Sequence, residues 1–293
     1  MLRFSGAGAS HVGHVREHNE DSGFVAAHIG LVADGVGGAA AGEIASATVA
    51  SGVVEAAAAM AAAGAPAEVT GTLEQVLAAG TDRGRSGIRR AIQHDLTRLG
   101  MATTLTVLLC DGERVVLGHV GDSRAYRLRD GTLTQLSTDH TYVAHLVASG
   151  QLGRDAVARH PWRNVVLRSM DGDPADQGVD LVPVDALAGD RLLVCSDGLT
   201  DLVGDEDIAA LLGAGTPAAA TAALVDAALA AGGRDNVTCV VLDLVADHLP
   251  AGRGAGRVDG VADPGTVLGA LAEPANVVDP GPTRIVRGPA ATA

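Results

Sequence analysis

Apolar residues recur along the chain with two different spacings, one typical of strands and one typical of helices. Short apolar or alternating runs between turn residues predict strands at residues 24–27, 29–33, 103–110, 114–120, 125–129, 179–184, 191–195 and 237–244. Longer stretches predict helices at residues 43–63, 73–99, 142–149, 206–212 and 217–231. The chain is therefore expected to combine helices with sheet.

Two Asp-Gly pairs lie between neighbouring strands and have the sequence of tight hairpin turns. Asp111-Gly112 joins TLTVLLC to RVVLGHV, and Asp130-Gly131 joins AYRLR to TLTQL. Hairpins pair strands antiparallel, so they favour an α+β fold over a parallel βαβ array. Only GAPAEVTG separates the two long helices, which predicts an antiparallel helix pair lying on one sheet face.

The character of the chain changes near residue 246. Residues 1–245 carry all of the predicted strands and helices, and we interpret them as one domain. Residues 246–293 are rich in Gly, Pro and Ala and have no sustained period. Such a composition predicts a flexible tail.

The composition excludes several kinds of chemistry. The 21 basic residues are all Arg, so the chain has no lysine for a Walker A loop, a kinase strand or a Schiff base. The net charge of -14 disfavours a nucleic-acid-binding surface. Hydrophobic residues make up 47% of the chain but aromatic residues only 2%, so the core must consist of Ala, Val and Leu.

Further sequence features concern the cellular compartment. Cys110, Cys195 and Cys239 lie in apolar runs without the spacing of a zinc site, which predicts buried, reduced thiols. The first residues lack the apolar core of a signal peptide, and no apolar run reaches the length of a membrane span. We therefore expect a cytoplasmic protein with no membrane or nucleic-acid partner. We also expect a monomer, although no pattern specifies the oligomeric state.

Two glycine-containing motifs suggest functions that their surroundings do not support. Gly35, Gly37 and Ala40 spell the dinucleotide-binding pattern G-x-G-x-x-A after a strand. That reading requires a second strand after the helix, whereas another helix follows here. The segment GDSRA around Ser123 resembles a nucleophile elbow, but the residues after Ser123 alternate as a strand rather than a helix.

Five aspartates stand at the ends of predicted strands. Asp34, Asp122 and Asp197 follow apolar strands, while Asp21 and Asp235 precede them. A single Asp in such a place is often only a turn residue. Five of them, three next to Gly, indicate a common site in loops at the end of a rigid scaffold.

Carboxylates that converge repel one another unless a cation lies between them. Oxygen ligands without Cys or His select a hard ion, Mg²⁺ or Mn²⁺. Two such ions can activate a bridging water and hold a phosphoryl oxygen. Arg16, five residues before Asp21, is near enough to bind a phosphate at the same place with two donors.

An ordered series of motifs carries a family resemblance over roughly residues 5–245. The motifs are VREHNEDS, LVADGVGG, ATTLTVLL, GHVGDSRAY, STDHT, LLVCSDGLTD and GGRDNVTCVV. In this order they resemble the metal-dependent serine/threonine phosphatases of the PPM (PP2C) family. The bacterial branch, whose catalytic domains oppose Ser/Thr kinases, is the most similar.

The resemblance implies a four-layer αββα sandwich, with two antiparallel β-sheets face to face and a helix pair on each outer face. It also implies a core site for two Mn²⁺ or Mg²⁺ ions. Asp34 would bridge both ions, and the carbonyl of Gly35 would bind one of them. Asp197 and Asp235 would bind the other ion.

The remaining implied roles concern the surroundings of these ions. Glu20 and Asp21 would act through metal-bound waters, and Arg16 would hold the substrate phosphate. Asp122 would help to bind a third ion, as in bacterial members. Asn236 belongs to the last motif and would support its loop. A mobile flap would lie at residues 149–163, beside the site.

The implied activity is hydrolysis of phosphoserine and phosphothreonine in proteins by a water that bridges the two metals. Phosphorylated proteins, and a Ser/Thr kinase among them, are the implied partners. The family's proposed general acid is not found, because Val36 and Ala39 occupy positions where some members carry His. His140 and His160 are candidates by residue type only, and structural hydrogen bonds are the simpler role for both.

A second hypothesis is a catalytically silent relative that binds phosphoproteins and regulates them without turnover. Such a protein would lack metal-binding aspartates, whereas all the expected ones are present here. The sequence does not distinguish Mn²⁺ from Mg²⁺, and it does not identify the physiological substrate.

Overall fold

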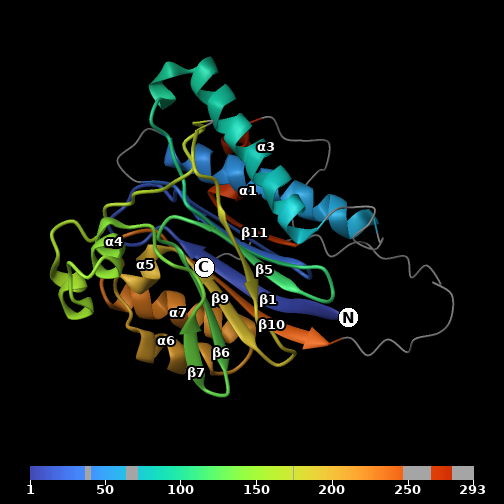
Figure 1. The fold of residues 1–293 in the computed structure, drawn as a ribbon, viewed down its shortest axis with the longest axis vertical. Helices are drawn as coiled ribbons and strands as arrows, with labels where there is room; N and C mark the ends of the chain where they lie inside the picture. Colours follow the sequence, from blue (N-terminus) through green and yellow to red (C-terminus); the bar gives the residue numbers. More distant parts are fainter. Residues whose placement is uncertain (37–40, 64–71, 174, 247–264, 279–293) are drawn as a thin grey trace.

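The computed structural model describes residues 1–36, 41–63, 72–173, 175–246 and 265–278. These residues form four layers, in which two antiparallel β-sheets pack face to face between two layers of helices (Figure 1). The predicted α+β class and the αββα layer order are confirmed.

Sheet A has five strands in the order β1-β10-β9-β6-β7. Every neighbouring pair in it is antiparallel, and β1 pairs with β10 along its whole length. Its strands are β1 (Leu2–His11), β6 (Arg124–Arg129), β7 (Thr132–Gln135), β9 (Arg191–Cys195) and β10 (Val237–Ala246). The predicted hairpin at Asp130-Gly131 joins β6 to β7.

Sheet B has six strands in the order β11-β2-β3-β4-β5-β8, again all antiparallel. Its strands are β2 (Asp21–Ala26), β3 (Ile29–Asp34), β4 (Leu105–Cys110), β5 (Val115–Val120), β8 (Asp180–Val184) and β11 (Thr266–Gly269). The predicted hairpin at Asp111-Gly112 joins β4 to β5.

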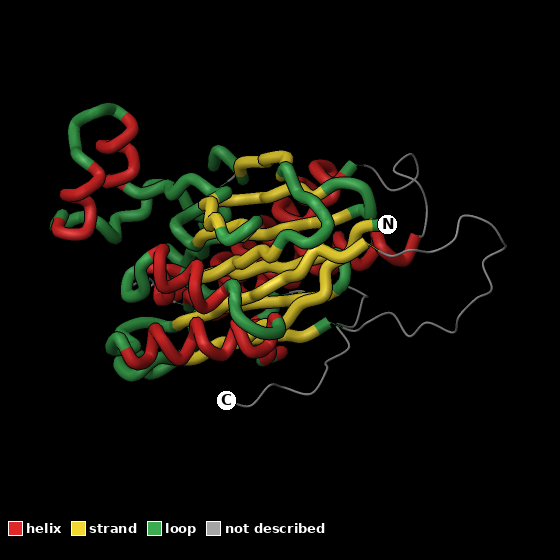
Figure 2. The backbone as a smooth tube through the Cα atoms, turned by 90° about the horizontal axis from the view of Figure 1, so that it is seen from below, coloured by secondary structure: helices red, strands yellow, loops and turns green. Residues whose placement is uncertain are grey.

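Two long helices cover sheet B, and shorter helices cover sheet A (Figure 1). The first layer holds α1 (Gly42–Ala63) and α3 (Leu73–His94), and the second holds α5 (Asp197–Thr200), α6 (Asp205–Leu212) and α7 (Pro217–Ala230). A further helix, α4, lies in a segment that projects beyond the sheets, at the left of Figures 1 and 2. The remaining helical elements are α4 (Tyr142–Ala148), η1 (Leu96–Arg98), η2 (Arg154–Arg159), η3 (Ala270–Ala272) and η4 (Pro274–Asn276).

Three apolar layers separate the four structural layers. Leu108 and Leu117 of sheet B meet Leu192 and Leu242 of sheet A between the sheets. The outer layers lie between sheet B and α1/α3, and between sheet A and α6/α7. Because the central strands are covered on both faces, they read as continuous apolar runs rather than alternating ones. The three cysteines are buried free thiols, as predicted.

The helix predicted at residues 73–99 ends earlier than expected. It begins with a capping box in which the Thr72 and Gln75 side chains each bond the other residue's backbone. It ends at His94, because the Asp95 carboxylate accepts the amide of Thr97 and starts the separate turn η1. An Asx turn of this kind competes with continuation of the helix.

All the predicted strands are present, but β1 was not predicted. After Leu2 and Phe4 its sequence consists of Ser, Gly and Ala up to His11, without the β-branched residues that mark a strand. The glycines have a packing reason, because a Cβ at Gly6 would lie 2.6 Å from the side chain of Leu242. The strand is therefore stabilised by its partner β10 rather than by its own propensity.

The prediction of a flexible tail over residues 246–293 is wrong for residues 265–278. They form β11, η3 and η4, which pack against sheet B and α1. Leu268 and Leu271 are buried there, at 5% and 3% exposure. A short apolar run that completes an existing sheet needs no period of its own. The rest of the predicted tail lies outside the described residues.

Helix α1 is the one helix in the described part of the chain that is long and apolar enough to cross a membrane. Of an 18-residue apolar stretch within Gly42–Ala62, 72% is buried inside the fold, against α3 and sheet B. This burial is typical of a core helix. The absence of a membrane span stays a prediction from the sequence.

Candidate metal and phosphate site

The predicted carboxylates gather at one end of the sandwich, where strand ends of both sheets meet. In sheet B, Asp21 begins β2 and Asp34 ends β3, directly opposite each other. In sheet A, Asp197 follows β9 and Asp235 precedes β10. Asp122 lies in the turn that leads from β5 of sheet B to β6 of sheet A. The fold thus brings together all five aspartates identified in the sequence.

Asp21 links the two sheets and has one oxygen without a partner. Its side chain is fully buried, and Ser196 Oγ donates a hydrogen bond to Oδ2 at 2.8 Å. Its Oδ1 is buried and accepts no hydrogen bond. Burial raises the pKa of Asp21 to about 6, although hydrogen bonds from Thr238 and Ser196 oppose the rise. A buried oxygen of this kind is costly unless a cation lies beside it.

The neighbouring carboxylates repel one another. Burial raises the pKa of Asp34 well above its usual range, and the charge of Asp21 raises it further. Burial likewise raises the pKa of Asp197, and Asp122 is its strongest neighbour. The pKa of Asp122 is raised to about 6 by burial and by Asp139. Shared divalent cations would remove this repulsion.

The donor set fits hard divalent ions that keep much of their water. Among the described residues, no group of three or more Asp, Glu, His or Cys side chains is already arranged to hold one ion. Mg²⁺ usually retains several waters and takes only one or two carboxylates from the protein. Carboxylates spread around a shared space, with an orphaned oxygen at Asp21, suit such ions. The ligand roles of the individual aspartates stay predictions.

The turn after β3 is held tightly by its neighbours. Thr104 Oγ1 accepts the amide of Asp34 at 3.0 Å, and Thr103 Oγ1 donates to the Asp34 carbonyl at 2.9 Å. Gly35 follows, and a Cβ there would lie 2.6 Å from the carbonyl group of Gly42. Only glycine lets the start of α1 approach this closely.

The same geometry excludes the two alternative motifs. After α1 the chain continues into α3 and then β4, which pairs antiparallel with β3, so no dinucleotide-binding βαβ unit forms. Ser123 is fully buried, and its Oγ lies 2.9 Å from Thr104 Oγ1. It is followed by β6 and is not an exposed nucleophile at the start of a helix.

Arg16 lies at the edge of the carboxylate group and remains accessible. Its Nη2 donates to Asp235 Oδ2 at 2.8 Å, and the two side chains are 42% and 38% exposed. This bond raises the pKa of Arg16, with burial acting against it. A solvent-screened pair of this kind is weak, so an arriving phosphate can compete for the guanidinium.

Asn236 fastens the loop that carries Arg16 and Glu20. Its side-chain amide donates to the carbonyls of Val12 and His18 at 2.9 and 3.0 Å. Its Oδ1 accepts the amide of Glu20 at 2.8 Å. Burial, and then the charge of Glu43, raises the pKa of Glu20. The expected supporting place of Asn236 is therefore visible in its contacts.

A groove of about 550 Å³ begins at the carboxylates and runs along the projecting segment. Asp122 and Asp197 line one part of it, and basic side chains line another. Within the described part of the chain, Arg154 and Arg234 form no ion pair, and Arg163 forms only a distant one, 3.9 Å from Asp201. The sequence analysis did not identify these residues. Their position was the one indication in the sequence, since Arg154 lies within the predicted flap and Arg163 lies at its end.

The two histidines proposed by residue type have structural partners. His140 Nδ1 accepts the amide of Gly121 at 3.1 Å, and Nε2 lies 2.9 Å from Asp180 Oδ2. Burial, and then the charge of Arg168, lowers the pKa of His140. His160 Nδ1 accepts the amide of Trp162 at 3.2 Å. None of these contacts indicates that His140 or His160 donates a proton to the leaving group of a substrate, and the general acid stays unassigned.

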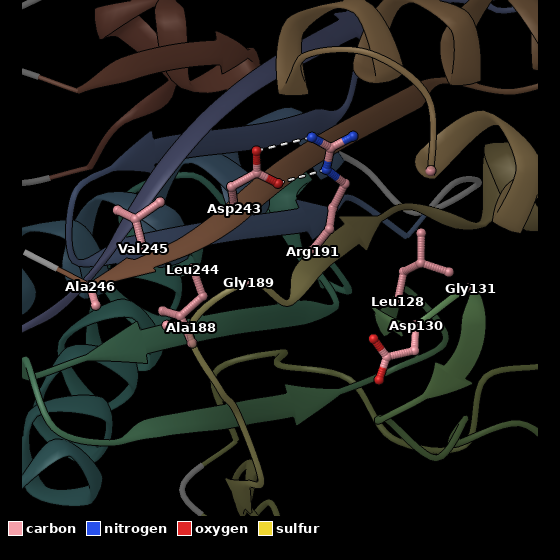
Figure 3. Close-up of a pocket in the computed structure, with 11 residues that line it drawn as sticks. Leu128, Asp130, Gly131, Ala188, Gly189, Arg191, Asp243, Leu244, Val245 and Ala246 are labelled. Carbon is pink, nitrogen blue, oxygen red and sulfur yellow. Dashed lines mark hydrogen bonds and ion pairs between the residues drawn. The ribbon is translucent and has the colours of Figure 1, made fainter.

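A larger cavity of about 670 Å³ lies at the opposite end of β9 and β10 (Figure 3). Arg191, which lines it, is held by Asp243 at 2.6 and 3.0 Å. The same guanidinium also donates to the carbonyls of Leu212 and Gly215. No donor is left for a ligand, so size alone does not make this cavity a functional site.

The comparison with protein families gives one match, described as protein phosphatase 2C, over residues 7–231. The serine/threonine protein phosphatase PstP of Mycobacterium tuberculosis is 39% identical over 275 residues, which cover 92% of this chain and 51% of PstP. The serine/threonine phosphatase Stp of Listeria welshimeri is 31% identical over 237 residues, which cover 79% of this chain and 92% of Stp.

Solved structures give the same result. The catalytic domain of PstP in complex with two manganese ions is 38% identical, with a TM-score of 0.75. The match covers 84% of this chain and 100% of that domain. The chain spans about half the length of full PstP, so the likeness concerns the catalytic domain.

Proposed function

This chain belongs to the protein phosphatase 2C family, and we propose that it hydrolyses phosphoserine and phosphothreonine in proteins, opposing Ser/Thr kinases. One observation supports this proposal above the others. Carboxylates from both sheets converge beside the accessible Arg16, and the buried Asp21 Oδ1 lacks a partner. The site thus combines cation ligands with a phosphate-binding group.

The ligand assignment that we propose follows the strand ends. Asp34 and the Gly35 carbonyl lie at the end of β3, and Asp197 and Asp235 lie at the matching ends of β9 and β10. When bound there, two Mn²⁺ or Mg²⁺ ions would supply an ionised water and stabilise charge on a phosphoryl oxygen. We propose that Asp122 serves a third ion.

The protein's own groups bind and orient the substrate. The guanidinium of Arg16 exchanges its exposed bond with Asp235 for two donors to the phosphate. Asn236 holds the loop that carries Arg16, which keeps the guanidinium at the mouth of the carboxylate group. The groove beside it accommodates the chain on either side of the phosphorylated residue, since Arg154 and Arg234 line it without ion pairs.

The second hypothesis, a silent phosphoprotein-binding relative, is not favoured. Every expected metal aspartate is present. The negative charges of neighbouring aspartates help to raise the pKa values within this group. Maintaining such repulsion without cations would be costly. We further propose that the protein acts in the cytoplasm as a monomer.

The direct test is phosphate release from a phosphothreonine peptide, with Mn²⁺, with Mg²⁺ and with EDTA. We expect turnover with a divalent ion, none with EDTA, and its loss in Asp197→Asn. The matched control is Asp226→Asn, an exposed carboxylate on α7, which should keep full activity. A folded chain that binds the phosphopeptide but never releases phosphate would support the silent relative instead.

A further inference from the structure

A short C-terminal strand lies beside the strand that begins with Asp21. β11 pairs antiparallel with β2, from Thr266 opposite Val25 to Gly269 opposite Ser22. β10 ends at Ala246 in sheet A, whereas β11, the next strand along the chain, begins at Thr266 in sheet B. β11 is red in Figure 1 and lies under α1, at the edge of sheet B.

The contact between Gly269 and Asp21 is close enough to require glycine. A Cβ at Gly269 would lie 2.1 Å from the Asp21 carbonyl oxygen and 3.0 Å from Ser10 Oγ. The φ angle of Gly269 is +60°, a conformation that other residues rarely adopt. Both features place the segment's backbone directly against the backbone of Asp21.

The side chain of Leu268 fills a space left by glycines of two other strands. A Cβ at Gly8 of β1 would lie 2.4 Å from Leu268 Cδ1, and one at Gly23 of β2 would lie 3.0 Å from it. Leu268 is 5% exposed and belongs to the apolar layer between the sheets. The two strands are therefore shaped to receive this side chain.

The end of the segment is anchored on α1. Ala270 and Leu271 are buried in the layer under α1. Thr48 Oγ1 donates to the Asn276 carbonyl at 3.3 Å and accepts the Val278 amide at 3.2 Å. Thr48 itself is 4% exposed, so these bonds are made inside the fold.

We propose that residues 265–278 are a positioning element of the metal site, which fixes the backbone of Asp21 from the side opposite to Asp34. This inference rests on the proposed function, because it concerns the proposed ions. Three neighbours then determine where the Asp21 carboxylate lies. Asp34 lies opposite it at the end of β3, Ser196 donates to its Oδ2, and Gly269 lies against its carbonyl.

The match to the family ends at residue 231, before β10 and before this segment. The PstP catalytic domain covers 84% of this chain, and the match to full-length PstP covers 92% of it. Without β11 the backbone groups of β2 would form an open sheet edge next to Asp21, free to pair elsewhere or to fray. An edge that frays would place the carboxylate less accurately for an ion.

The test uses the full chain and compares two Gly→Ala substitutions. Gly269→Ala forces a methyl group against the Asp21 carbonyl. The matched control is Gly131→Ala in the β6–β7 turn, whose φ of +78° brings similar backbone strain but whose Cβ meets nothing within 4 Å. The measurements are Mn²⁺ affinity by calorimetry, amide hydrogen exchange of β2, and the melting temperature without metal.

We expect Gly269→Ala to weaken Mn²⁺ binding about tenfold and to speed exchange in β2, whereas Gly131→Ala lowers only the melting temperature. Equal Mn²⁺ affinities in all three proteins would overturn the proposal. If Gly269→Ala does not fold, Thr48→Val decides, because it removes the bonds that anchor the segment on α1 and changes no carboxylate. We expect it to speed exchange in β11 and to weaken Mn²⁺ binding in the same direction, and unchanged Mn²⁺ affinity would overturn the proposal.

These results separate the two proposals. If the unchanged chain binds Mn²⁺ but releases no phosphate, the phosphatase proposal fails while the positioning role is still measured by affinity. If the chain hydrolyses phosphopeptides and Gly269→Ala binds Mn²⁺ normally, only the positioning role fails. An unchanged chain that binds no Mn²⁺ overturns both.

Discussion

Carboxylates at the two ends of β9 and β10 have different neighbours: other carboxylates at one end and arginines at the other. At one end, Asp197 and Asp235 face Asp21, Asp34 and Asp122, and the exposed Arg16 pairs with Asp235. At the other end, Asp190 and Asp243 are each paired with an arginine. The same pair of strands thus carries an unsatisfied acidic group at one end and carboxylates held by arginines at the other.

The paired end is built from bidentate contacts. Arg129 donates to both oxygens of Asp190, at 2.7 and 2.8 Å, although Asp190 is only 2% exposed. Burial alone would raise the pKa of Asp190, but the bonds from Arg129 and from the Leu187 amide outweigh it and the pKa is lowered. Arg191 and Asp243 form a similar pair at the wall of the larger cavity (Figure 3).

The difference separates carboxylates that stabilise the fold from carboxylates that are proposed to bind ligands. Paired carboxylates stabilise the fold without any ligand, whereas the repelling group is stabilised only when cations arrive. The larger cavity lies at the paired end and the proposed site at the repelling end. Unsatisfied charge is therefore a better guide to the site than cavity volume.

The largest expected effect comes from removing a carboxylate at the repelling end. Asp34→Asn should lower phosphate release by roughly 10³-fold, because the proposed bridging ligand is lost. The metal-free variant should melt no lower than the unchanged chain, since a repelling charge is removed. Calorimetry in EDTA, together with a phosphopeptide assay in Mn²⁺, measures both. A clear loss of metal-free stability would contradict the idea that this carboxylate is unsatisfied.

At the paired end we expect a smaller effect, on stability rather than on activity. Asp190→Asn leaves the Arg129 guanidinium without its bidentate partner and should lower the melting temperature by roughly 5 °C. Phosphate release at 25 °C should stay within about twofold, because Asp190 precedes β9 and the carboxylate group lies at the other end of that strand. Loss of activity in a folded variant would show that the two ends are coupled.

The smallest effect concerns pH and the raised pKa of Asp21. In the metal-free fold this pKa is about 6, against 3.8 for an ordinary Asp, so its stabilising contribution is full below about 3.8 and is lost as the pH rises through 6. His119, whose pKa burial lowers to about 4, gives the opposite trend. Subtracting the free energy of unfolding of the variant Asp21→Asn from that of the unchanged chain cancels the contribution of His119.

The measurement is the free energy of unfolding of both proteins in EDTA at pH 5 and pH 7. The unchanged chain should gain about 1 kcal/mol relative to Asp21→Asn on going from pH 7 to pH 5. A difference that does not change between the two pH values would mean that Asp21 has an ordinary pKa in the metal-free fold.

Much of the fold could be predicted because its strands are buried on both faces. Continuous apolar runs such as those of β4, β5 and β9 mark themselves in the sequence, and the Asp-Gly turns give their antiparallel order. β1 and β11 could not be found in this way. β1 consists largely of small residues, and the four residues of β11 depend on β2 for their structure.

The same division holds within the candidate site. The aspartates were visible because each one interrupts or borders an apolar strand, which is a local signal. Ser196, Arg154, Arg234 and Gly269 carry no such signal, since each acquires its place from a segment far away in the chain. Their contributions could not be derived from spacing.

Local pattern along the chain was enough to say which segments are strands, where they end, and that acidic residues stand at those ends. Which ends come together depends on strand pairing between distant segments, such as Asp21 with Asp34 and Ser196 with Asp21. Burial then gives these contacts their consequence, because a carboxylate that is harmless in water becomes costly when it is enclosed beside others. Only the folded chain shows that carboxylates at one end of β9 and β10 are paired with arginines while those at the other end repel one another.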